Sequence, residues 1–197
     1  MTDSILEISL LVEFGKLKFS QSLTSSTVAI TVAKSRTFYL HSNLLTAESE
    51  RFSKSLSGKF KEAEENAIHL EDEDPNLFGF FVEYLYRNRP CEVKHNSAYV
   101  TLARLYALGE RIMAPNFQSH CLWRFTQSLG TNSDISGESI CELLRIACTE
   151  ITERPKEDPM RVHIFWYGPK SPTSRNSTCF ISSWEIFRTW ESSCAYG

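Results

Sequence analysis

The chain lacks the short motifs that mark several large classes of enzyme. Its 197 residues include only eight glycines. These are scattered, so neither GxGxxG nor GxxxxGK[ST], the turns that cradle phosphates, occurs. The GxSxG turn that exposes a hydrolase nucleophile is also missing. The sequence therefore predicts neither a nucleotide site nor a serine hydrolase.

Long apolar runs and an excess of positive charge are missing as well. No stretch reaches the ~18 uncharged, mainly apolar residues that a membrane-spanning helix needs. Asp3 and Glu7 interrupt the N-terminus where a secretory signal would be basic and then apolar. Lys and Arg number 21 against 24 acids, a net charge of −3, which disfavours nucleic-acid backbones as partners. We therefore expect a cytoplasmic or nuclear protein that binds neither a membrane nor nucleic acid.

The six cysteines form no CxxC pair, and a chain of this length can bury a core without disulfides or a structural metal. We therefore expect reduced thiols, no metal site and no cofactor. His120 and Cys121 are the most suggestive pair for thiol chemistry, but neighbours on a helix point about 100° apart. A small cysteine-dependent enzyme stays open as an alternative, favoured only by the number of thiols and histidines.

Hydrophobic periodicity predicts strands followed by helices. Alternation over Val28–Val32 predicts a strand, a polar turn at Lys34–Arg36 follows, and Thr37–Leu40 reads as the hairpin partner. From Ser42 the spacing becomes helical, which predicts one helix or a pair of short helices ending near Gly58. Acidic residues flank a further predicted strand at Ala67–Leu70, and we interpret them as a solvated rim.

The rest of the chain is predicted to be helical. Asp74 before Pro75 is typical of a helix start, because the carboxylate caps free N–H groups and proline needs no donor there. An apolar stripe follows at helical spacing as far as Tyr86. Further helices are predicted from four segments: 97–112, 115–130, 140–151 and 160–166. Strands followed by a helical body indicate an α+β protein.

A specific motif lies within the first predicted helical stretch. His41, Leu45, Ser49 and Phe52 reproduce an H-x3-L-x3-S-x2-F run, with aromatic Phe38 three residues before the histidine. In this respect the chain resembles the BTB/POZ domain family. Later landmarks also match: Phe60-Lys61-Glu62, Ile68–Leu70, Asp74-Pro75, Phe78, Tyr84-Leu85-Tyr86 and Leu102–Met113. Thr149–Trp166 is similar to the helical extension of short fungal BTB proteins, so the resemblance covers residues 25–167.

The resemblance implies a fold and a domain arrangement. The fold is a small mixed sheet of short strands, capped by a helical hairpin and further helices, with a C-terminal helical extension. The predicted organisation has four parts: a lead-in at 1–24 with one strand at Leu6–Val12, a BTB/POZ domain at 25–130, the helical extension at 131–167, and a polar tail at 168–197. The tail either docks as a helix or stays loose.

The resemblance also implies a function carried by interfaces rather than by an active site. Members commonly form homodimers, and a subset serves as substrate adaptors of the cullin-3 ubiquitin ligase. That subset has a hydrophobic-x-Glu loop before the third strand, so Phe60 and Glu62 are the candidate cullin contacts. The family-pattern residues expected to be structural are Phe38, His41, Leu45, Ser49, Phe52, Phe78, Tyr84 and Tyr86.

Two points bear on partners other than cullin-3. Trp184 and Trp190, in the tail, are candidates for contact with an unknown substrate or partner protein; alternatively, they cover the helical body. Many members carry an aspartate that opens the first core strand and shapes a charged groove, whereas this chain has Ser26-Thr27-Val28. Groove-dependent corepressor binding is therefore not implied, although a nuclear scaffold or transcriptional regulator stays open as an alternative.

Overall fold

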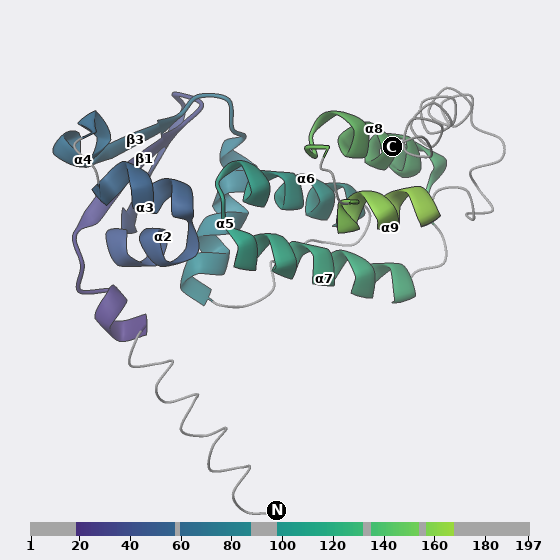
Figure 1. Cartoon of the computed structure of the whole chain (residues 1–197), viewed down its shortest axis with the longest axis horizontal. Coiled ribbons are helices and arrows are strands. Elements are labelled where there is room, and N and C mark those ends of the chain that lie inside the picture. Colours follow the sequence, from purple (N-terminus) through teal and green to yellow (C-terminus); the bar gives the residue numbers. More distant parts are fainter. Residues whose placement is uncertain (1–18, 58–59, 88–97, 132–134, 154–156, 168–197) are drawn as a thin grey trace, which may run out of the picture. The chain divides into compact units, whose positions relative to one another are not determined.

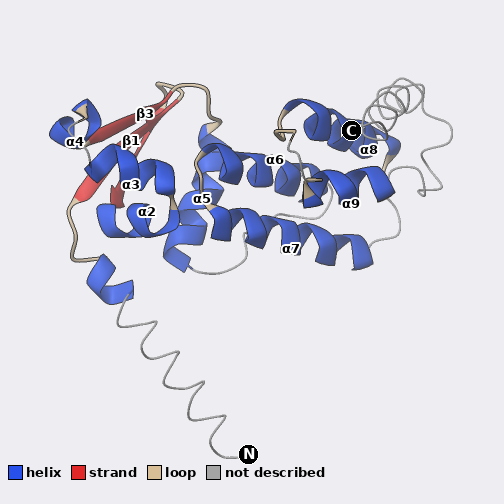
Figure 2. Ribbon diagram, viewed as in Figure 1, coloured by secondary structure: helices blue, strands red, loops and turns tan. Residues whose placement is uncertain are grey.

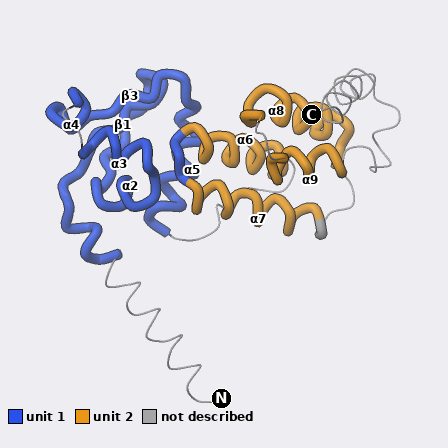
Figure 3. The backbone as a smooth tube through the Cα atoms, in the orientation of Figure 1, with its two compact units in different colours: residues 1–88, 112–114 blue, residues 89–111, 115–197 orange. Residues whose placement is uncertain are grey.

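The computed structural model describes residues 19–57, 60–87, 98–131, 135–153 and 157–167, and most of its elements are labelled in Figure 1. Contacts divide the chain into two compact units (Figure 3): residues 1–88 with 112–114, and residues 89–111 with 115–197. The first unit contains all the strands of the described residues, and the second is helical (Figure 2).

The first unit is built on a three-stranded mixed sheet in the order β2-β1-β3. The strands are β1 (Thr27–Val32), β2 (Arg36–His41) and β3 (Ala67–Leu70). β1 runs antiparallel to β2, with Thr27 opposite His41, and parallel to β3, with Ala29 opposite Ala67. The predicted alternation is confirmed, because Val28, Ile30 and Val32 are fully buried on one face.

The turn between β1 and β2 lies one residue earlier than predicted. Ala33 and Lys34 both have positive φ, 48° and 55°, and the Ser35 N–H donates to the Val32 carbonyl at 3.1 Å. Arg36 already belongs to β2. Two consecutive left-handed residues give a hairpin turn whose twist matches that of the strands.

Short helices follow β2 in the first unit. The predicted helical stretch is a pair, α2 (Ser42–Glu48) and α3 (Glu50–Ser57), separated by Ser49 in an extended conformation with φ −125° and ψ 121°. The prediction of a solvated acidic rim on both sides of β3 was partly wrong, because Lys61–Glu65 forms helix α4 and Glu73, after β3, is buried. Helix α5 (Pro75–Arg87) begins as predicted: Asp74 accepts a hydrogen bond from the Asn76 N–H at 2.7 Å.

The second unit consists of the four described helices α6 (Ala98–Arg111), α7 (Pro115–Thr131), α8 (Gly137–Thr149) and α9 (Pro159–Tyr167). These match the four predicted helices to within a few residues at each end. Helices α6 and α7 pack closely at Gly109, where an added Cβ would lie 3.1 Å from Gln118 Cβ. The core of this unit is aliphatic and aromatic, with Leu105, Leu108 and Phe117 fully buried.

Candidate interaction surfaces

The aromatic residues of the family pattern meet in the core of the first unit. The ring of Phe78, on α5, lies 5.3 Å from Phe38 on β2 and 6.5 Å from Phe52 on α3, measured between centroids. Phe81 joins the cluster 5.6 Å from Phe78. Such tilted and edge-on pairs add to the stabilisation that burial alone provides. The cluster fastens α3 and α5 to the same face of the sheet.

His41 is hydrogen-bonded at the end of β2. Its Nδ1 lies 2.8 Å from the Tyr86 hydroxyl, and its backbone N–H donates to the same oxygen at 3.1 Å. The Tyr86 hydroxyl therefore contacts both the side chain and the backbone of His41. His41 and Tyr86 thus join β2 to α5.

Ser49 occupies the break between α2 and α3 and is almost fully buried. Its hydroxyl donates to the Ile112 carbonyl and accepts from the Phe52 N–H at 3.1 Å. The second contact caps α3, and the first ties that helix to the segment Ile112–Ala114. The backbone adds a parallel contact, from the Glu50 N–H to the Met113 carbonyl at 3.0 Å. The remaining pattern residues differ in burial: Leu45 is fully buried and Tyr84 is half-buried.

Phe60 and Glu62, the candidate cullin contacts, lie at the start of α4. Phe60 is extended, with φ −89° and ψ 154°, and its side chain is 58% exposed. Glu62 lies in the first turn of α4 and is half-buried. Between them, Lys61 forms an exposed ion pair with Glu65 at 3.2 Å. The loop therefore presents a large apolar ring to solvent, two residues before a carboxylate.

Two of the described cysteines, Cys121 and Cys148, lie in surroundings that do not favour a reactive thiol. Cys121 is 1% exposed and packs in the core of the second unit. Its neighbour His120 lies against the Trp123 ring, and burial and the nearby Arg124 hold the histidine pKa below its usual value. Cys148 is exposed, but the protein around its sulfur raises the pKa of the thiol, mainly by desolvation. A raised pKa lowers the thiolate fraction, which is the opposite of what nucleophilic catalysis needs.

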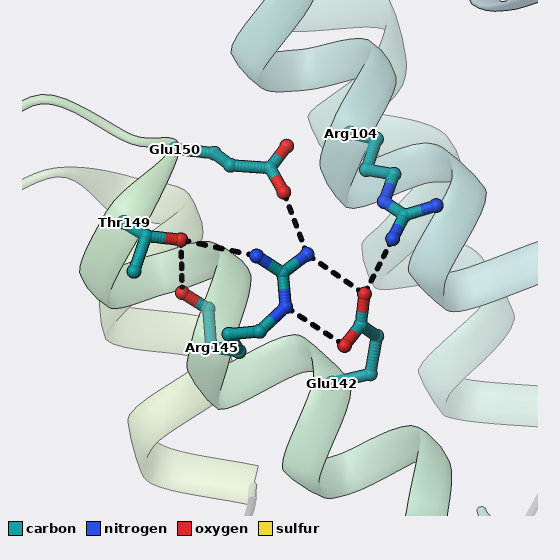
Figure 4. Close-up of polar contacts among 5 residues, drawn as sticks. All are labelled: Arg104, Glu142, Arg145, Thr149 and Glu150. Carbon is teal, nitrogen blue, oxygen red and sulfur yellow. Dashed lines mark hydrogen bonds and ion pairs between the residues drawn. The ribbon is translucent and has the colours of Figure 1, made fainter.

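Charged side chains in the second unit form a closed network (Figure 4). Glu142 on α8 accepts from Arg104 on α6 and from Arg145, whose Nε and Nη2 lie 2.9 and 2.8 Å from its two oxygens. Arg145 also pairs with Glu150 at 2.8 Å. The two arginines hold the pKa of Glu142 below its ordinary value, Arg145 chiefly through its hydrogen bonds. Two cations and two anions satisfy one another, so the network fastens α6 to α8 and leaves no excess charge for a ligand.

A buried carboxylate that sequence reasoning missed starts helix α9. Asp158 is 3% exposed. One of its oxygens accepts from the Met160 and Arg161 N–H groups at 2.9 and 3.1 Å, and the other accepts from the Tyr106 hydroxyl at 2.8 Å. The signal was present, because Asp158 before Pro159 repeats the Asp74-Pro75 helix start. The sequence could not show that Tyr106 supplies the second contact.

Exposed aromatic residues were also missed. Tyr39 on β2 is 70% exposed, Trp123 on α7 is 53% exposed and Trp166 on α9 is 64% exposed. Trp184 and Trp190, the predicted partner contacts, lie outside the described residues.

The stretches that the structure describes contain no group of acidic, histidine and cysteine side chains able to hold a metal ion. None of their helices combines the length and apolar character needed to cross a bilayer.

The fold and the pattern residues define a small α+β interaction module, and comparison with known families agrees. The BTB/POZ domain model matches residues 17–121, more than half of the chain. The protein belongs to the BTB/POZ family, whose domains mediate protein–protein association. A search of curated proteins finds no match.

Proposed function

We propose that this protein is a self-associating BTB adaptor that binds cullin-3 through Phe60 and Glu62. The observation that supports the cullin contact is the 58% exposure of Phe60 at the N-terminus of α4. A phenylalanine that packed on its own helix would be buried. This one instead leaves most of its ring available to a partner.

The chemistry of the loop suits a small binding hot spot. Burying a phenylalanine side chain that is fully exposed in the free protein contributes about 1.5–3 kcal/mol. A neighbouring carboxylate supplies hydrogen bonds that orient the partner, and anchors of this kind carry most of an interface's binding energy. Because Phe60 is already partly covered, about 1–2 kcal/mol of apolar burial is available from it on the same scale.

Calorimetry with the purified cullin-3 N-terminal domain tests the contact. We expect binding of micromolar Kd or tighter by the full chain, and a loss of at least about 30-fold in the Phe60→Ala, Glu62→Ala double variant, the equivalent of ~2 kcal/mol. Lys61→Ala is the matched control, because it changes the residue between them and removes only an exposed ion pair. Equal affinity of the double variant and the wild type would eliminate this loop as the contact.

The proposal of self-association rests on the family, whose members commonly form homodimers. Sedimentation of the full chain at micromolar concentration is expected to show a dimer. A folded monomer under these conditions would remove self-association without affecting the cullin test. The adaptor proposal also carries the expectation that the protein works in the cytoplasm or the nucleus, which imaging of a tagged full chain would check.

A further inference from the structure

Strand β2 is an edge of the sheet, and the direction of its backbone groups follows from its pairing with β1. The Ser42 N–H donates to the Ser26 carbonyl at 2.9 Å. Residues facing each other in an antiparallel pair alternate between bonded and unbonded. In the observed register, the even-numbered residues of β2 are therefore the ones bonded to β1. The backbone N–H and C=O groups of Thr37, Tyr39 and His41 point away from β1.

Both ends of this outer edge are closed by other contacts. The His41 N–H donates to the Tyr86 hydroxyl at 3.1 Å, and the Ser35 N–H is used by the turn that precedes the strand. Within the described residues, the outward backbone groups of Thr37 and Tyr39 have no hydrogen-bond partner. Both side chains are exposed, that of Tyr39 by 70%. These two residues form a short strand-pairing site.

The side chains of β2 do little to keep another strand away. Natural edge strands are commonly blocked by charged residues or proline. The sequence of β2 is RTFYLH, and its single lysine, arginine or acid is Arg36 at the first position. At the other edge of the sheet, β3 is preceded by Glu64 and Glu65 and followed by Glu71 and Asp72. An antiparallel pair of β3 strands would bring acids beside acids at both ends, so charge favours β2 as the edge that pairs with itself.

A two-fold axis leaves one register in which the free groups of β2 satisfy one another. In this register Thr37 lies opposite the second copy's Tyr39, and Tyr39 lies opposite its Thr37. Each of the two pairs exchanges both N–H···O=C bonds. The next register with bonded groups facing each other is displaced by two residues, and it needs the N–H of Ser35 or of His41, which are already engaged.

The same register places Phe38 opposite its equivalent in the second copy. Side chains of an unbonded antiparallel pair lie close together, and aromatic pairs at such positions stabilise a sheet. Phe38 is half-buried: the Phe78 ring lies 5.3 Å away, and the Arg36 guanidinium lies 6.0 Å from its centroid. Pairing would cover the part of the ring that is still exposed. The two Arg36 side chains would lie at opposite ends of the pair, each facing the other copy's Leu40.

We propose that β2 is a self-association edge, through which two copies of the chain pair antiparallel at Thr37 and Tyr39. The two sheets then form one sheet that is continuous across both copies. This inference rests on the proposed function, which includes self-association, and it assigns a surface and a register to that association.

An exchange of charges at the paired positions tests the register by sedimentation of the full chain. Thr37→Lys with Tyr39→Lys puts lysine opposite lysine in both pairs, so the dimer Kd is expected to rise about tenfold or more, although the net charge of −3 moves toward zero. Thr37→Lys with Tyr39→Glu puts opposite charges in both pairs, and its Kd should return to within about threefold of the wild type. Thr27→Lys with His69→Lys, at exposed positions of β1 and β3, is the matched control and should leave the Kd unchanged.

Amide hydrogen exchange, measured residue by residue, shows whether the edge itself is paired. The amides of Thr37 and Tyr39 are expected to exchange at least about tenfold more slowly as the protein concentration rises through the dimer Kd. The amide of Phe38, bonded to β1, should stay protected throughout and reports on the folding of each variant.

The outcomes separate this inference from the self-association on which it rests. A folded monomer at micromolar concentration would overturn both. A dimer in which the Thr37 and Tyr39 amides exchange freely, or one that the two lysines leave intact, would overturn the edge pairing alone. Protection of these amides in a monomer would show that the chain covers its own edge, and it would likewise overturn the pairing.

Discussion

Replacement of Ser49 by alanine is expected to destabilise the first unit strongly, although it removes a single oxygen. The hydroxyl caps α3 at the Phe52 N–H and donates to the Ile112 carbonyl. Loss of an N-cap costs about 1 kcal/mol. A buried carbonyl left without its donor costs a further ~1–3 kcal/mol. We therefore expect Ser49→Ala to lower the free energy of unfolding by about 2–4 kcal/mol in total.

Urea unfolding followed by two probes measures this effect. All four tryptophans (Trp123, Trp166, Trp184 and Trp190) belong to the second unit, whereas far-ultraviolet circular dichroism reports on both units. If the units unfold independently, Ser49→Ala shifts the dichroism transition and leaves the fluorescence transition in place. If they unfold together, both transitions shift equally.

Ser57→Ala is the matched control, because its hydroxyl makes an exposed contact with Ser53 within the same helix. Its effect should stay within about 0.5 kcal/mol, as is usual for surface positions. A Ser49→Ala variant as stable as Ser57→Ala by both probes would refute the reasoning that the buried hydroxyl fastens α3 to Ile112.

Two further predictions concern the second unit. Asp158→Ala removes the cap of α9 and the hydrogen bond that the buried Tyr106 hydroxyl donates to Asp158, so a loss of about 2–4 kcal/mol is expected from urea unfolding followed by fluorescence. Asp158→Asn, which can keep the cap, should lose less, and equal losses by the two variants would contradict this account. Glu142 has a lowered folded pKa, so its contribution is present above the unfolded pKa and is lost as pH falls through the folded value. Glu142→Gln is therefore expected to cost about 1 kcal/mol at pH 7, a low figure because its partners are more than a third exposed. The deficit should shrink on acidification below about pH 4, and one that is independent of pH would show that the ion pairs are not its cause.

Much of the fold followed from local pattern. Alternation in β1, the Asp74-Pro75 start of α5 and the apolar stripes of the later helices depend on neighbours in sequence, and each appears where predicted. Helix α4 was missed because Lys61–Glu65 has no apolar face of its own and forms beside the sheet. The break at Ser49 could not be located, since both a continuous helix and a helix pair fit the spacing of Leu45, Ser49 and Phe52.

The candidate surfaces were predictable only in part. The family pattern identified Phe60 and Glu62, but exposure is a property of the folded chain and could not be read from three residues. The period of two in a strand puts Tyr39 on the face opposite Phe38 and Leu40, but whether that face is covered is a property of the folded chain. The contacts of Asp158 with Tyr106 and of Ser49 with Ile112 join residues 52 and 63 positions apart, a separation at which no local pattern operates.

The short segment Ile112–Ala114 has a consequence for how the protein can be made. Although α6 and α7 on either side of it belong to the second unit, these three residues belong to the first. During synthesis the first unit therefore cannot be completed when residue 88 leaves the ribosome, because the acceptors for Ser49 and Glu50, the carbonyls of Ile112 and Met113, have not yet emerged. Any fragment intended to represent the sheet and its helices must extend beyond Ala114, and a fragment cut at the apparent boundary after α5 would lack the contact that closes α3.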